Sequence, residues 1–78
     1  MKVKSITTVL TTRGWAVRQR NYDWPDLYIV AREPAQYTIH QAKRLASVLR
    51  RDIARHGAWA SSAEPLPPGV LLIEKQEQ

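Results

Sequence analysis

The sequence contains no cysteine and no phenylalanine, and only three of its 78 residues are glycine. Without cysteine the chain forms no disulfide and offers no thiolate to a metal ion. The glycines are well separated, which excludes a glycine-rich phosphate-binding loop. The segment from Ser5 to Thr12 is too polar for the core of a signal peptide, and no apolar run approaches the roughly 20 residues that span a bilayer. We therefore expect a cytoplasmic protein with no membrane span.

Acidic residues are also scarce, with 7 Asp and Glu against 12 Lys and Arg, which gives a formal net charge of +5 and a pI of about 10.1. Such a balance favours an acidic partner, either nucleic acid or an acidic protein surface. The two histidines have no partners at zinc-ligand spacing, so we expect no resident cofactor. Hydrophobic residues make up 44% of the chain, which is enough for one small folded domain over residues 1–78.

The N-terminal segment has an apolar pattern that favours a helix. Apolar residues recur there at spacings of three and four, namely Val3, Ile6, Val9 and Leu10. This pattern predicts an amphipathic helix over residues 3–13 with Gly14 as its C-cap. Threonine is abundant in the same stretch, and its β-branched side chain favours a strand, which is the alternative for this segment.

Residues 15–20 alternate between two faces, as a half-exposed strand does. The basic positions of this strand lead into a loop that carries aromatic residues. Cations and aromatic rings interleave along Arg18, Arg20, Tyr22 and Trp24. Such a combination follows a nucleic-acid backbone and stacks on unpaired bases. Because large aromatic residues in small domains are usually needed for burial, we expect Trp24 to fill the edge of the core instead.

The next two segments are a short apolar run and an ambiguous one. Residues 26–31 are bounded by turn residues, which predicts a buried strand. Residues 37–43 allow two interpretations. As a strand, they put Gln41 and Lys43 on one face. As the start of a helix, Thr38 and Gln41 form a capping box, in which each side chain bonds to the backbone amide of the other residue.

The segment that follows has the clearest helical pattern in the chain. Its apolar residues fall within roughly 100° of one another on a helical projection, and its cations gather on the opposite side. The apolar set is Ala42, Leu45, Ala46, Leu49 and Ile53, and the basic set is Lys43, Arg44, Arg50, Arg51 and Arg55. Gly57 marks the end of the helix as a C-cap. The basic stripe is placed either to lie along phosphates or to remain solvated.

Proline-rich residues 58–69 predict an extended linker, and residues 70–73 predict a strand that is covered on both faces. The elements together indicate an α+β domain with a small mixed β-sheet, one long amphipathic helix and a shorter N-terminal helix. The expected order is α-β-β-β-α-β, or β-β-β-α-β if the N-terminal segment is a strand. An unpaired edge of this sheet leaves homodimerisation open.

In the strand interpretation, one pair of motifs is similar to a known enzyme family. Asp26 opens one apolar strand, and Gln41-Ala42-Lys43-Arg44 stands near the end of the next. This arrangement resembles the PD-(D/E)xK nuclease superfamily, and in particular its Mrr-type restriction branch, in which Gln-x-Lys is followed by a basic residue. The resemblance implies the α-β-β-β-α-β order. It also implies that Asp26 binds a metal ion, Gln41 offers an amide oxygen, and Lys43 polarises the attacking water or the phosphate.

We expect a nucleic-acid-associated domain with a reduced nuclease-like core that binds rather than cleaves, because the acidic residues around such a site are few. Its binding residues are Arg18, Arg20, Lys43, Arg44, Arg50, Arg51 and Arg55. One alternative is a non-enzymatic protein-binding module. In size and charge the chain is similar to small accessory proteins of phages and mobile elements, such as anti-CRISPR and anti-restriction inhibitors of host defence complexes. The other alternative is a metal-dependent nuclease that uses Mg²⁺.

Overall fold

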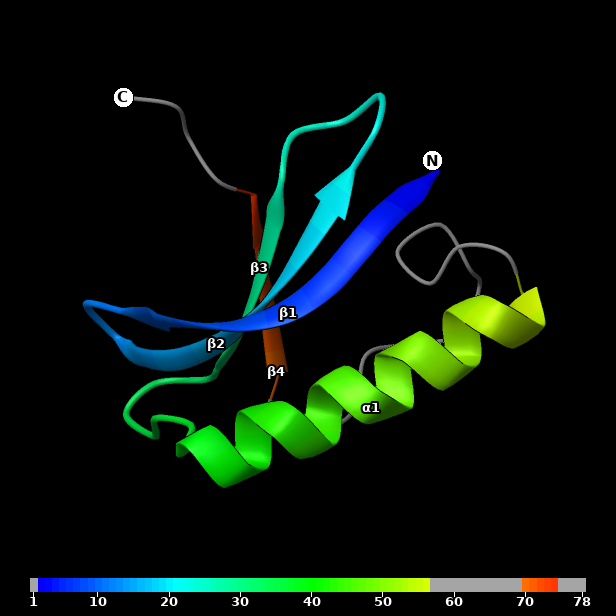
Figure 1. The fold of residues 1–78 in the computed structure, drawn as a ribbon. Coiled ribbons are helices and arrows are strands. Elements are labelled where there is room, and N and C mark those ends of the chain that lie inside the picture. The colour runs from blue at the N-terminus through cyan, green and yellow to red at the C-terminus, as the bar shows by residue number, and fades with distance from the viewer. Residues whose placement is uncertain (1, 57–69, 75–78) are drawn as a thin grey trace.

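In the part of the chain that the structure describes, a single antiparallel sheet carries one helix across one of its faces (Figure 1). The computed structural model describes residues 2–56 and 70–74. Its elements in chain order are β1 (Val3–Thr11), β2 (Gly14–Asn21), β3 (Leu27–Ala31), α1 (Ile39–His56) and β4 (Val70–Glu74). The strands lie side by side in the order β1-β2-β3-β4, so β1 and β4 are the edges of the sheet.

The prediction of a helix over residues 3–13 is wrong, because Val3–Thr11 forms strand β1. β1 and β2 make an antiparallel hairpin whose pairing runs from Val3 opposite Asn21 to Thr11 opposite Gly14. The hairpin turns tightly at Gly14, which has a φ of 96° that side-chain-bearing residues rarely adopt. The β-branched threonines favour an extended backbone, and pairing with β2 gives that backbone its hydrogen-bond partners. The alternative prediction of a strand for this segment is therefore the correct one.

The expected mixed sheet is also wrong, because every strand pair is antiparallel. The strands predicted over residues 15–20, 26–31 and 70–73 are present as β2, β3 and β4. However, β4 pairs only with β3 and forms an edge, and Leu71 is 40% exposed. The prediction that this strand is covered on both faces is therefore wrong at Leu71. The order α-β-β-β-α-β does not occur.

The ambiguous segment over residues 37–43 is the start of a helix, and its interpretation as a strand is wrong. Helix α1 begins at Ile39, and Thr38 and Gln41 form a capping box across its start. The backbone amide of Thr38 donates to Oε1 of Gln41 at 2.9 Å, and the amide of Gln41 donates to Oγ1 of Thr38 at 3.3 Å. These bonds satisfy backbone donors that a helix N-terminus otherwise leaves without partners. Among the described residues, the strand-type pairing that this segment makes is an isolated bridge between Tyr37 and Trp15.

The core lies between α1 and the sheet face that carries the odd-numbered positions of β2. The helix lies closest to β1 and β2. The buried cluster is formed by Ile6, Val17 and Ile29 from the strands and by Ala42, Ala46 and Leu49 from the helix. The predicted apolar stripe of the helix is thus confirmed at its centre. Ala42 and Ala46 are fully buried, and their small side chains allow the helix backbone to approach the sheet closely.

The expected C-cap at Gly57 and the expected linker over residues 58–69 lie outside the residues that the structure describes. Within residues 2–56 and 70–74, no helix is long and apolar enough to cross a membrane.

Candidate nucleic-acid interface

The outer side of α1 carries exposed cations that have no acidic neighbours on the helix apart from Asp52. We call the exposed side chains of Lys43, Arg44, Arg51 and Arg55 the cation face of α1. At 100° per residue, Arg44, Arg51 and Arg55 point within about 40° of one another and away from the buried alanines, while Lys43 lies on the flank nearer the sheet. The helix therefore presents a row of positive charge along its length.

These cations are not neutralised by ion pairs within the described part of the chain. The ion pairs there join Arg13 to Glu33 at 3.4 Å and Arg20 to Asp26 at 3.9 Å. Neither pair touches the cation face of α1. Because an exposed arginine without a carboxylate partner keeps its full charge and its hydrogen-bond donors available, this face is suited to an anionic ligand.

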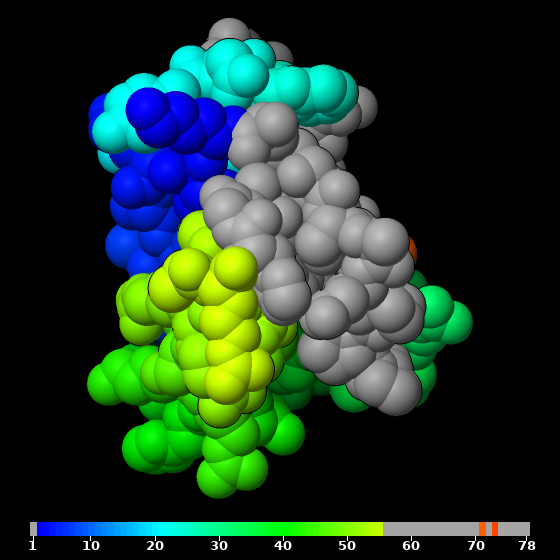
Figure 2. Space-filling view, turned by 90° about the vertical axis from the view of Figure 1, so that its right-hand side faces the viewer, coloured from blue at the N-terminus to red at the C-terminus, as the bar shows by residue number. Residues whose placement is uncertain are grey.

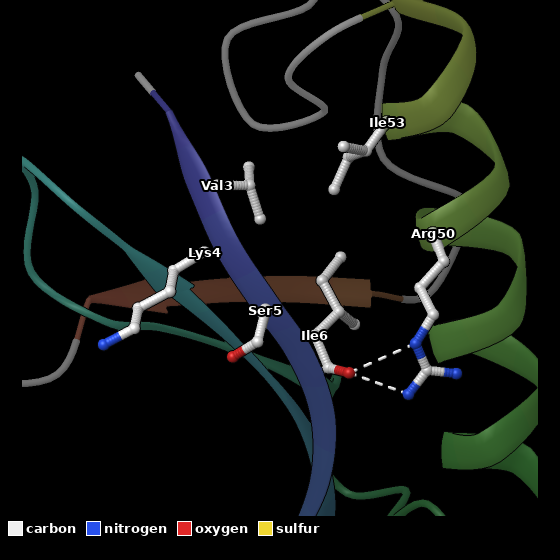
Figure 3. A pocket seen from close by; sticks show the side chains of 6 residues that line it. All are labelled: Val3, Lys4, Ser5, Ile6, Arg50 and Ile53. Atoms are coloured by element: carbon white, nitrogen blue, oxygen red, sulfur yellow. Dashed lines mark hydrogen bonds between the residues drawn. The ribbon is translucent and has the colours of Figure 1, made fainter.

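Arg50 does not belong to this face, and its expected place on the outer stripe is wrong. Its Nε and its Nη2 donate to the backbone oxygen of Ile6 at 3.2 and 2.7 Å (Figure 3). On the helical projection Arg50 lies about 80° from Ala42, at the border of the apolar side, and β1 passes beside that border. Arg50 therefore fastens the helix to the edge strand of the sheet.

Arg18 and Arg20 lie apart from the helical cations. On β2 they occupy the face opposite to Val17 and Gln19, which face α1 and are fully buried. Arg20 is exposed and forms its weak pair with Asp26 at 3.9 Å. The predicted set of seven binding residues is thus divided between two faces of the molecule, and the cation face of α1 holds the largest group on one element.

The residues of the expected nuclease site are not brought together. Asp26 precedes Leu27, which pairs with Gln19 near the end of β2. The start of α1 lies near Trp15, at the other end of β2, because Tyr37 bridges to Trp15. These two ends are about 13 Å apart along the strand. Asp26 is therefore distant from the first turn of α1.

Gln41 and Lys43 are also separated from each other. Residues two apart face the same way on a strand, but they point to different sides on a helix. Gln41 uses its side chain in the capping box, and Lys43 points into solvent. Among the described residues, no group of three histidine, aspartate or glutamate side chains is arranged to hold a metal ion. Asp26, Gln41 and Lys43 are therefore not assembled into one site in this fold.

A hollow of about 340 Å³ lies between β1 and the second half of α1 (Figure 3). It is lined by Val3, Lys4, Ser5, Ile6, Arg50 and Ile53. The lining is largely apolar, and the guanidinium of Arg50 donates its hydrogen bonds to the backbone oxygen of Ile6. A second hollow of about 330 Å³ lies beside the β1–β2 turn and contains the ion pair between Arg13 and Glu33. Neither hollow brings together the groups that a hydrolytic reaction needs.

The loop between β2 and β3 carries two exposed aromatic side chains. Tyr22 is 64% exposed and Trp24 is 54% exposed, so the expectation that Trp24 fills the core edge is wrong. The ammonium groups of Lys2 and Lys4 lie 5.5 and 5.8 Å from the centre of the Tyr22 ring. No local pattern in the sequence places these lysines beside the loop. The pairing of β1 with β2 brings Lys2 and Lys4 next to Tyr22.

Comparisons with protein-family models, with curated proteins and with solved structures found no match to this chain. The assignment of a function therefore depends on the geometry and chemistry of the residues themselves. Among the described residues, the charged outer side of α1 and the aromatic loop are surfaces that carry distinct chemistry.

Proposed function

We propose that this protein binds nucleic acid through the phosphate backbone, with the cation face of α1 as the contact surface. The observation that supports the proposal is that Lys43, Arg44, Arg51 and Arg55 are exposed on a helix whose only acidic residue is Asp52. Clustered Lys and Arg along one helix are the electrostatic footprint of phosphate binding. The sequence has no cysteine, which suits a reducing cytoplasm, and we place the binding there.

The length of the face fits several phosphates. Arg44 and Arg55 are separated by about 16 Å along the helix axis, at 1.5 Å per residue. Duplex DNA presents a phosphate every 3.4 Å per strand along its axis, so a face of this length spans about five base pairs. Four contacts predict that log affinity falls with log salt with a slope of about −3.6 for a duplex and about −2.8 for a single strand.

The experiment is a titration of fluorescein-labelled DNA, duplex and single-stranded, followed by anisotropy from 25 to about 300 mM salt. We expect Arg44→Gln combined with Arg51→Gln to weaken binding to both probes and to reduce the duplex slope by about two units, because each lost phosphate contact removes about 0.9. The glutamines keep long polar side chains on the helix and remove only the charge.

Arg32→Gln combined with Arg13→Gln is the matched control. It removes two positive charges beside the C-terminal end of β3, where Arg32 follows Ala31 and Arg13 donates to the backbone oxygen of Ala31, and it changes no residue of α1. If this pair and the Arg44 and Arg51 pair weaken binding equally, net charge alone accounts for the affinity and the helix is not the contact surface. If the parent protein binds neither probe at low salt, the proposal is overturned, and an acidic protein surface becomes the partner to seek by pull-down.

A further inference from the structure

The β2–β3 loop exposes aromatic surface that a domain of this size normally buries. Tyr22 and Trp24 are 64% and 54% exposed, although the core of this small domain is built largely from Ala, Val, Ile and Leu. Exposed large aromatic residues of this kind mark binding surfaces more often than scattered aliphatic residues do. The two rings are two residues apart on one short loop, so both are exposed in the same small part of the surface.

This loop is held in place by a chain of hydrogen bonds that begins in the core. Gln19, which is fully buried, donates from Nε2 to Oδ1 of Asn21 at 3.0 Å. Asn21 in turn donates from Nδ2 to the backbone oxygen of Pro25 at 2.9 Å. The Asn21 side chain therefore closes the loop by joining its two ends. A loop fixed in this way loses little conformational entropy when a ligand binds.

The loop is also tied to the start of β1, which Figure 2 shows directly beside it. The amide of Tyr22 donates to the backbone oxygen of Lys2 at 3.0 Å, and the amide of Lys2 donates to Oδ1 of Asp23 at 3.3 Å. These bonds place the ammonium groups of Lys2 and Lys4 near the Tyr22 ring. The surface thus combines two exposed rings with two lysines.

We infer that Tyr22 and Trp24 form a stacking site for unpaired bases, and that the nucleic acid bound by this protein is therefore single-stranded. The inference rests on the proposed function. Aromatic rings beside cations stack on successive bases of a single strand, whereas a duplex keeps the faces of its bases stacked on one another and inaccessible. Asp23 and Asp26 offset part of the local positive charge, so stacking rather than phosphate attraction is the main contribution of this loop.

The test compares three fluorescein-labelled DNA probes of equal length: a single strand, its duplex, and a single strand in which most sites are abasic. The parent protein is expected to bind the intact single strand most tightly. Trp24→Ala and Tyr22→Ala are each expected to weaken that binding about tenfold and to leave duplex affinity and the salt slope unchanged. Trp24→Phe retains a ring and is expected to retain most of the affinity.

Leu10→Ala is the control, because Leu10 is 67% exposed and lies at the opposite end of β1 from the loop. It is expected to leave all affinities unchanged. A second readout is quenching of tryptophan fluorescence by the single strand. Trp24→Phe should remove most of that quenching.

The outcomes separate this inference from the proposed function. If Trp24→Ala and Tyr22→Ala bind the single strand as tightly as the parent, the stacking site is overturned. The proposed function then stands as long as the Arg44 and Arg51 variant still loses affinity. Equal affinity of the parent for the intact and abasic strands also overturns the stacking site. Failure of the parent to bind any probe overturns both.

Discussion

The guanidinium of Arg50 and the backbone oxygen of Ile6 are joined by two hydrogen bonds, of 3.2 and 2.7 Å, although 44 residues separate them in the chain. β1 is an edge strand, and its pairing with β2 leaves outward-facing carbonyls without sheet partners. Arg50 donates to a backbone carbonyl of this edge strand and fastens the helix to the sheet at the same point. A cation in a basic stripe is thus part of the fold rather than of the interface.

We expect Arg50→Ala to lower the free energy of unfolding by about 1–2 kcal/mol, because it removes both hydrogen bonds from a charged donor to the backbone oxygen of Ile6. Urea denaturation monitored by circular dichroism measures the change. Arg51→Ala is the matched control on the next residue, where the side chain is exposed, and its effect should stay within about 0.5 kcal/mol. Equal losses in the two variants would show that the Arg50 contact contributes nothing specific.

The close approach of α1 to the sheet predicts that enlarging a buried alanine is harmful. Ala46 has no exposed surface, and it faces the cluster that contains Val17 and Ile29. Ala46→Leu should destabilise the protein by about 1–3 kcal/mol, because the extra side-chain atoms push the helix away from the strands. Ala54→Leu places the same change on the exposed side of the same helix and should be nearly neutral. The measurement is the urea midpoint of each variant.

The long helix was predictable because its apolar stripe is regular and long enough to exclude a strand. Ala42, Ala46 and Leu49 are fully buried, as the period of 3.6 residues requires. The N-terminal strand was harder to predict, because Val3, Ile6 and Val9 fit a helical spacing by coincidence. In the structure Ile6 is buried against the helix, while Leu10 is 67% exposed and belongs to no core. Threonine content was the better indicator there, since it reflects backbone preference and not a spacing pattern.

The candidate site was only partly predictable, because its composition depends on tertiary contacts. A helical projection places Arg50 beside the apolar side but does not reveal that β1 runs along that flank. The exposure of Trp24 depends on how Asn21 closes its loop, through a hydrogen bond to Pro25 that no local pattern indicates. Lys2 meets Tyr22 only through strand pairing across 20 residues. The exposure of Lys43, Arg44, Arg51 and Arg55 needed only the helix itself, so the sequence predicted these four positions, although it grouped Arg50 with them.

The capping box gives a prediction at the start of the helix. Thr38→Ala should cost about 0.5–2 kcal/mol of stability, because Oγ1 of Thr38 accepts the bond from the amide of Gln41 and no acidic residue lies in the first turn to compensate. Thr12→Ala is the control, since Thr12 is an exposed turn residue outside the helix. Thermal unfolding followed at 222 nm compares the two. A neutral Thr38→Ala would mean that the bond accepted by Oγ1 of Thr38 contributes nothing measurable to stability.

Tyr37 predicts a dependence of stability on alkaline pH. Burial of the phenol raises the pKa of Tyr37 above its ordinary value of 10.0. Above pH 10 the unfolded chain releases this proton before the folded chain does, so the free energy of unfolding falls as pH rises through the folded pKa. The loss of unfolding free energy from one such group is at most about 1.4 kcal/mol per pH unit, and below pH 10 it is absent.

Urea midpoints at pH 8 and pH 11 measure this loss of stability. Tyr37→Phe should reduce the difference between the two midpoints, whereas Tyr22→Phe, which alters an exposed ring, should leave it unchanged. A Tyr37→Phe variant with the parent's full alkaline loss would show that Tyr37 is not the source of the pH dependence.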